Sequence, residues 1–110
     1  MSIANCISAN VISTINSSVS GVGSFYGIYS IDGGLGSYPL KHIHQNRINA
    51  VNYNSSGDFL GIYANSLGDG GTAQGSSVNN NTITGINWSG NIFGIYHGIQ
   101  SSPNQKVLIF

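Results

Sequence analysis

The sequence predicts an all-β fold in which residues 1–110 form one domain, with about three coils of a right-handed parallel β-helix. Two short motifs, Asn-x-Ile-x-x-Ile/Val and Gly-Ile-Tyr, each occur three times and always in the same order. Successive copies of either motif are 33 to 36 residues apart. The first motif begins at Asn10, Asn46 and Asn81, and the second at Gly27, Gly61 and Gly94. Two separate motifs with one period indicate a structural repeat.

The apolar positions of the repeat predict strands rather than helices. They are β-branched or aromatic and occur in short runs that Gly, Asn and Ser interrupt, a pattern typical of strands. No stretch of ten or more residues has a 3.6-residue apolar period with helix caps. One repeat cannot bury its own apolar face, so we expect the copies to stack. The stacked columns would include Ile12, Ile48 and Ile83, and also Ile28, Ile62 and Ile95.

Each repeat contains, in order, a strand, a turn at the Asn, a second strand, a Ser/Gly connection, the Gly-Ile-Tyr strand and a long loop. The repeats cover roughly residues 7–42, 43–77 and 78–106, and residues 107–110 begin a fourth coil. Asn tolerates the left-handed backbone of a sharp corner, and its amide can bond to a neighbouring coil. Asn10, Asn46 and Asn81 are therefore the predicted structural asparagines.

The apolar segment at residues 107–110 lies where solenoids normally have a polar or helical cap. We therefore expect either a fragment of a longer β-helix or an oligomer whose copies associate through their exposed coil ends.

Alternation within the Gly-Ile-Tyr strand predicts which side chains face outward. The residues at Tyr26, Leu60 and Phe93 would face inward with the isoleucines two positions later, and the glycines would face outward. Tyr29, Tyr63 and Tyr96 would then stack outward at the coil spacing of about 4.8 Å. Trp88 lies in the connection that varies between copies. Aromatic rows can stack on sugar rings, so these three tyrosines and Trp88 are candidates for contacting glycans. The alternative is that the row only stabilises the stack.

Residues 78–86 (VNNNTITGI), continuing to residues 93–96 (FGIY), resemble the repeat of pectin-lyase-like right-handed parallel β-helix proteins. The other two copies match this repeat more loosely. The resemblance implies the fold and leaves the function open, because the family includes polysaccharide lyases and hydrolases, phage tailspikes and bacterial adhesins. Its lyases use clustered acids for calcium with an Arg or Lys base, and its hydrolases use several close Asp residues.

The sequence contains no comparable catalytic or metal-binding cluster. The acids are Asp32, Asp58 and Asp69, which do not share one column of the repeat. The Asp-Gly-Gly segments in the loops 30–42 and 64–77 fit turns, and one Asp in each is too few for calcium. His42 and His44 share a strand face without a third ligand beside them. We expect no catalytic residue, no metal site and no cofactor.

Composition narrows the choice of partners. Charged residues make up 5% of the chain, against roughly 25% in soluble proteins, and the formal net charge is zero. Nucleic acid is therefore not an expected partner. Membrane insertion is not expected either, since no apolar run approaches the roughly 18 residues that spanning requires. Cys6 is the only cysteine, and we expect a buried, inert thiol.

A polar but uncharged surface of Ser, Asn and Gly is typical of a secreted or cell-surface protein. We expect a non-enzymatic structural or binding segment of a bacterial surface or secreted β-helix protein. It would be adhesin-like and would contact carbohydrate or a host-surface ligand. The alternative is a coil segment of a polysaccharide lyase or glycoside hydrolase.

Overall fold

The computed structural model describes residues 5–31, 41–67, 76–99 and 107–109, and none of these residues is helical. They form ten strands: β1 (Asn5–Ser8), β2 (Val11–Gly21), β3 (Phe25–Ser30), β4 (Lys41–His44), β5 (Arg47–Ser55), β6 (Phe59–Leu67), β7 (Ser76–Asn79), β8 (Thr82–Trp88), β9 (Ile92–Ile99) and β10 (Val107–Ile109).

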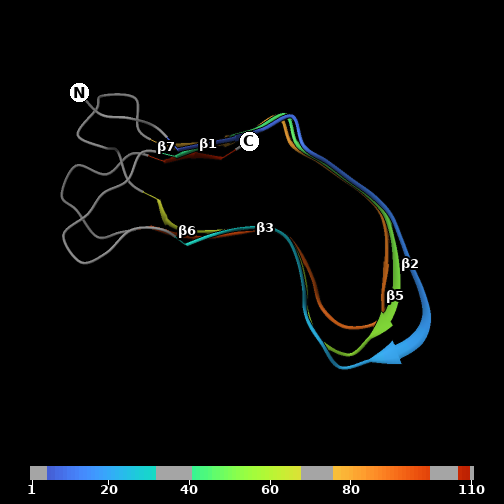
Figure 1. Ribbon diagram of the computed structural model, residues 1–110. Coiled ribbons are helices and arrows are strands. Elements are labelled where there is room, and N and C mark those ends of the chain that lie inside the picture. Colours follow the sequence, from blue (N-terminus) through green and yellow to red (C-terminus); the bar gives the residue numbers. More distant parts are fainter. Residues whose placement is uncertain (1–4, 32–40, 68–75, 100–106, 110) are drawn as a thin grey trace.

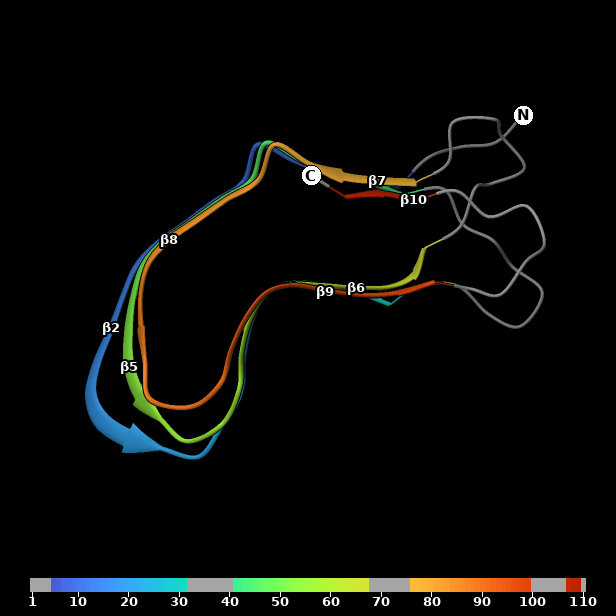
Figure 2. The same cartoon turned by 180° about the vertical axis from the view of Figure 1, so that it is seen from behind.

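All the strand pairs are parallel, and the strands make three sheets ordered β1-β4-β7-β10, β2-β5-β8 and β3-β6-β9. The chain passes through these sheets in the same order three times. We call the passes coil 1 (β1–β3), coil 2 (β4–β6) and coil 3 (β7–β9). Viewed along the stack, the coils superimpose, and β3 and β6 lie opposite β1 and β7 (Figure 1; Figure 2 shows the reverse side). This all-β arrangement of stacked parallel strands is consistent with the predicted β-helix.

The predicted isoleucine columns are confirmed by the strand register. Ile48 pairs with Ile12 and Ile83, and Ile62 pairs with Ile28 and Ile95. Both coil 2 isoleucines are fully buried, whereas Ile12, Ile83 and Ile95 are only partly buried. Coil 2 has a neighbouring coil on each side, so its side chains are covered from both directions. The core is therefore densest at its middle layer.

Two rows of left-handed residues shape each coil. Ala9, Gln45 and Asn80 form the first row, and Thr14, Ala50 and Gly85 form the second, with φ between 51° and 64°. The first row immediately precedes the repeated asparagines. The expectation that Asn10, Asn46 and Asn81 themselves adopt the left-handed conformation is therefore wrong. Because the chain turns one residue earlier, the backbone N–H and the side-chain amide of Asn10 and of Asn46 can both bond to the next coil.

The three asparagines form a continuous hydrogen-bonded row. The Oδ1 of Asn46 accepts hydrogen bonds from the backbone N–H and the Nδ2 of Asn10, at 3.1 and 3.0 Å. The Oδ1 of Asn81 accepts the same two bonds from Asn46, at 3.0 and 2.9 Å. Asn46 Nδ2 also donates to the carbonyl of Ile7 at 3.0 Å. Asn46 is 2% exposed, so its amide supplies partners that water cannot reach.

Replacing Asn46 with Ala should lower the free energy of unfolding by about 3 kcal/mol, because buried backbone groups on coil 1 lose their partners. Asn52, in the exposed row that joins Asn16 and Asn87, is the control. Asn52→Ala should cost less than about 1 kcal/mol, since water can replace the lost bonds. Urea denaturation of both variants measures the difference, and equal costs would contradict a structural role specific to Asn46.

Thr14→Gly should stabilise the fold by about 1 kcal/mol, because a β-branched residue at φ 58° is strained and glycine is not. The reverse substitution at the equivalent position of coil 3, Gly85→Thr, should destabilise the fold. At Gly85 φ is 64°, and an added Cβ would lie 3.2 Å from the Ala50 nitrogen. Thermal unfolding should give a higher melting temperature for Thr14→Gly and a lower one for Gly85→Thr. A lower melting temperature for Thr14→Gly would refute the proposed strain at this position.

Candidate functional site

The glycine of each Gly-Ile-Tyr motif in coils 1 and 2 faces the core. A Cβ on Gly27 would lie 2.6 Å from Cδ1 of Ile48, and one on Gly61 would lie 2.6 Å from Cδ1 of Ile83. The same added atoms would lie 2.5 Å from the Gly61 carbonyl oxygen and 2.7 Å from that of Gly94. Isoleucines of the β2-β5-β8 sheet therefore pack directly on the backbone of the opposite sheet, which only glycine permits.

Because these glycines face the core, the predicted alternation of inward and outward residues in the Gly-Ile-Tyr strands is wrong. Phe25 and Phe59, one residue earlier than predicted, face the core and stack with their ring centroids 5.2 Å apart. Tyr26 and Phe93 were expected to face inward, yet both are exposed. The glycines occupy an inward position without a side chain, so simple alternation assigns the wrong face to the residues before them.

Six side chains gather on the outer face of the β3-β6-β9 sheet, and we call them the aromatic patch: Tyr26, Tyr29, Leu60, Tyr63, Phe93 and Tyr96. The rings of Tyr29 and Tyr63 stack with centroids 5.1 Å apart and planes 18° apart, and those of Tyr63 and Tyr96 stack at 5.2 Å and 5°. The three tyrosines expected to form an outward row thus lie together in one stack.

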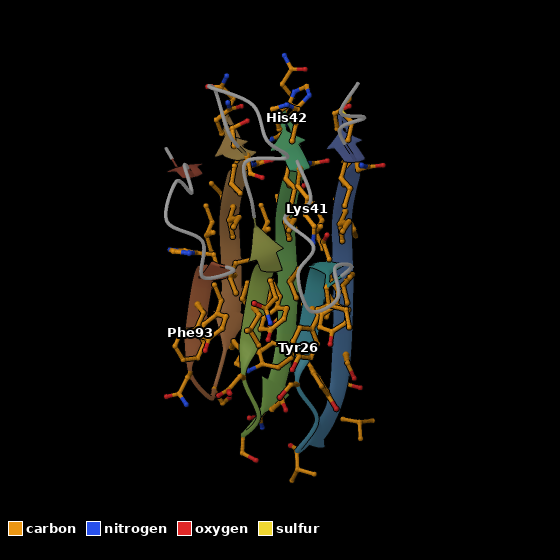
Figure 3. All side chains as sticks on the ribbon, turned by 90° about the vertical axis from the view of Figure 1, so that its left-hand side faces the viewer. Tyr26, Lys41, His42 and Phe93 are labelled. Carbon is orange, nitrogen blue, oxygen red and sulfur yellow. The ribbon has the colours of Figure 1, made fainter. Side chains whose placement is uncertain are left out.

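The other column of the patch runs alongside this row. Tyr26, Leu60 and Phe93 pair in register, and Figure 3 shows Tyr26 and Phe93 on the same side of the molecule. The Tyr26 ring lies 5.2 Å from Tyr29 and 5.8 Å from Tyr63, nearly perpendicular to both, and Phe93 lies 6.2 Å from Tyr96 at 83°.

Most of the patch is open to solvent. The exposed fractions are 46% for Tyr26, 55% for Tyr29, 39% for Phe93 and 48% for Tyr96, whereas Leu60 is buried between its neighbours. Leu60 lies outside the main core cluster. The patch is therefore a separate apolar surface, built on three adjacent strands.

Trp88 does not belong to the patch, contrary to expectation. It is 9% exposed and ends β8 inside the core, where its ring contacts Phe25, Tyr53 and Phe59. Its Nε1 donates a hydrogen bond to the Gly57 carbonyl at 2.8 Å. Side chains two residues apart on a strand face the same side, so Trp88 faces inward like Ile86. Trp88 is thus unavailable to a glycan.

The outer face of β1, β4 and β7 carries polar groups. Cys6 is exposed rather than buried, because it alternates with inward-facing Ile7, and its Sγ lies 3.4 Å from Nε2 of His44. His42 Nδ1 lies 2.8 Å from the Ser77 hydroxyl. Within the described ranges, no group of three or more His, Cys, Asp or Glu side chains could hold a metal ion.

Two charged side chains of the described segments, those of Lys41 and Asp58, form hydrogen bonds. Lys41, which is labelled in Figure 3, is buried at the start of β4, and its Nζ donates a hydrogen bond to the Asn65 carbonyl at 2.7 Å. Asp58 lies in a polar column: its N–H donates to the Ser24 hydroxyl, and its Oδ1 accepts a bond from Asn91 Nδ2 at 2.9 Å. Asp32 and Asp69 lie outside the described residues, as does most of each of the loops 30–42 and 64–77.

Comparisons of this protein with family models, curated proteins and solved structures find no match. The described residues also include no helix of the length and apolar character that crossing a membrane requires. The aromatic patch is therefore interpreted from its own geometry.

Gly61→Ala should destabilise the fold by about 2 kcal/mol, because its Cβ would collide with Ile83 and with the backbone of Gly94. Gly94→Ala is the matched control, since its Cβ would meet only Cδ1 of Ile83, at 4.0 Å, and it should change stability by less than about 0.5 kcal/mol. Chemical denaturation compares the two. Similar losses at both positions would contradict the close packing at Gly61.

Proposed function

We propose that this chain is a segment of a right-handed parallel β-helix of the pectin-lyase-like kind, in a bacterial cell-surface or secreted protein. Its proposed role is non-enzymatic binding of a neutral, extended carbohydrate chain. The observation that carries the proposal is the aromatic patch, in which five exposed or partly exposed rings and Leu60 share one outer face.

The ring geometry suits sugar binding. Pyranose C–H groups pack on the electron-rich face of an aromatic ring, and a tyrosine hydroxyl can bond to sugar hydroxyls. Within the stacked row the rings cover one another. The rings of Tyr26 and Phe93 are turned 75° to 87° from the row, so each keeps a face that the row does not cover. They lie two coils apart, about 9.6 Å along the stack, and could contact successive parts of one chain.

The absence of charge from the patch favours a neutral glycan over a polyuronate. All six patch side chains are uncharged, and the described charged residues, Lys41, Arg47 and Asp58, lie elsewhere in coil 2. An anionic polysaccharide would lose its hydration there without gaining an opposite charge. The strands also hold the rings before a ligand arrives, which reduces the ordering cost of binding.

Calorimetric titration with cellohexaose, chitohexaose and hexagalacturonate tests the proposal. A neutral hexasaccharide should bind, and Tyr26→Ala should weaken that binding about tenfold. The variant should stay folded and lose only about 1 kcal/mol of stability from its ring contacts, because Tyr26 is exposed and outside the core cluster.

Tyr63→Phe keeps the ring and should retain most of the affinity, and Val22→Ala, 85% exposed and outside the patch, should have no effect. Binding of no hexasaccharide, or full affinity in Tyr26→Ala, would refute the proposal. Turnover of polygalacturonate that is lost in Asp58→Asn would instead support the lyase or hydrolase alternative.

A further inference from the structure

The outer face of the β3-β6-β9 sheet brings three oxidisable side chains into one column. Tyr29, Tyr63 and Tyr96, which we call the tyrosine stack, pair in register on parallel strands. The centroids of neighbouring rings lie 5.1 and 5.2 Å apart, and the ring planes differ by 18° and 5°. Equivalent residues of parallel strands carry their side chains in the same direction, so the hydroxyl end of each ring lies next to that of its neighbour.

The tyrosine stack is accessible from solvent. Tyr29 is 55% exposed and Tyr96 is 48% exposed, and Tyr63 between them is partly exposed. Tyr63 belongs to both neighbouring pairs, because Tyr29 and Tyr96 are two coils apart, about 9.6 Å along the stack. Any direct link within the stack therefore includes Tyr63.

We propose that the tyrosine stack is a site of oxidative cross-linking, at which Tyr63 forms a carbon–carbon bond to Tyr29 or to Tyr96 and so joins two coils covalently. The co-substrate is a one-electron oxidant, such as a haem peroxidase acting with hydrogen peroxide. The link depends only on the chemistry and the spacing of the phenols, and not on the proposed binding of glycans.

Two electrons and two protons leave the protein for each link. The oxidant removes one electron from each phenol and the hydroxyl proton is released, which leaves a tyrosyl radical whose unpaired electron is shared by the oxygen and the two nearest ring carbons, the Cε atoms. Two such radicals couple by forming one Cε–Cε bond. Each coupled carbon then loses its hydrogen as a proton and each oxygen takes one up, so both phenols are restored. One hydrogen peroxide molecule accepts the two electrons and two protons and becomes two water molecules.

The geometry of the stack favours this bond over other pairings. The strands hold two phenols side by side, so coupling is intramolecular and has a high effective concentration. Exposed side chains change rotamer rapidly, which lets the neighbouring Cε carbons close the remaining distance. Tyr26 is oriented differently, at 75° to Tyr29 and 87° to Tyr63, so its ring meets theirs edge to face. In the described part of the chain, Tyr53 packs on Trp88 rather than on a tyrosine.

A link in the tyrosine stack would act as a staple between coils. Tyr63 lies 34 residues after Tyr29 and 33 residues before Tyr96. The bond would therefore close a long loop in the unfolded chain and reduce its conformational freedom, as a disulfide does. Cys6 is the only cysteine in these 110 residues, so a disulfide within them cannot supply such a link.

Oxidation of dilute protein with a haem peroxidase and hydrogen peroxide tests the proposal. A Cys6→Ser background removes the competing oxidation of the thiol. The monomer should gain dityrosine fluorescence and lose the mass of two hydrogen atoms. Protease digestion should then give a cross-linked peptide that joins residue 63 to residue 29 or 96, and a denaturing gel separates these monomers from linked dimers.

Tyr63→Phe keeps the stacked ring but removes the phenol from both pairs, so this variant should lose the dityrosine signal of the monomer. Tyr26→Phe and Tyr53→Phe each remove a phenol outside the stack and are the matched controls, which should cross-link as fully as the parent. The proposal would be overturned by an oxidised parent monomer without dityrosine, by a signal that persists in Tyr63→Phe, or by a signal that is lost in Tyr26→Phe.

Thermal unfolding provides a second readout. The cross-linked monomer should melt at least about 10 °C above oxidised Tyr63→Phe, because the staple constrains the unfolded chain. Oxidised Tyr63→Phe is the suitable reference, since it has met the same oxidant without forming the link, and the two proteins should melt together before oxidation. Equal melting temperatures after oxidation would overturn the role of the link as a staple.

Discussion

Each coil rests on the previous one at the spacing of a parallel sheet, so every side chain must accept its counterpart in the next coil as a neighbour. Asn46 shows what this requires at the corners. There the chain leaves one sheet for the next, and its backbone groups lose their strand partners. The Asn46 amide bonds to coil 1 and to coil 3 at once, and so continues the hydrogen bonding where strand pairing stops.

The same constraint explains the unusual composition. Like charges stacked at about 4.8 Å repel one another, whereas isoleucine, asparagine and tyrosine pack or hydrogen-bond with copies of themselves. The described charges each occur once in a column: Arg47 lies between Val11 and Thr82, and Asp58 forms bonds with Ser24 and Asn91. A low charge content is thus a consequence of stacking identical positions, before any function is considered.

The sequence was sufficient to predict the stacking, because two motifs with one period determine which residues share a column. It could not determine the face of every column. Alternation by two holds only while each residue contributes a side chain of ordinary size, and Gly61 breaks it by letting Ile83 pack on the backbone. The outward positions of Tyr26 and Phe93 were missed for that reason.

Trp88 was misplaced for a different reason. Its segment varies between copies, and the register partner in coil 1 is Ser17, so no repeated residue identified the column as part of the core. Alternation from Ile86 would have indicated the correct face, so local periodicity is more informative there than comparison between copies. Predictions from repeats are strongest where the copies agree and weakest where one copy fills the core with a larger side chain.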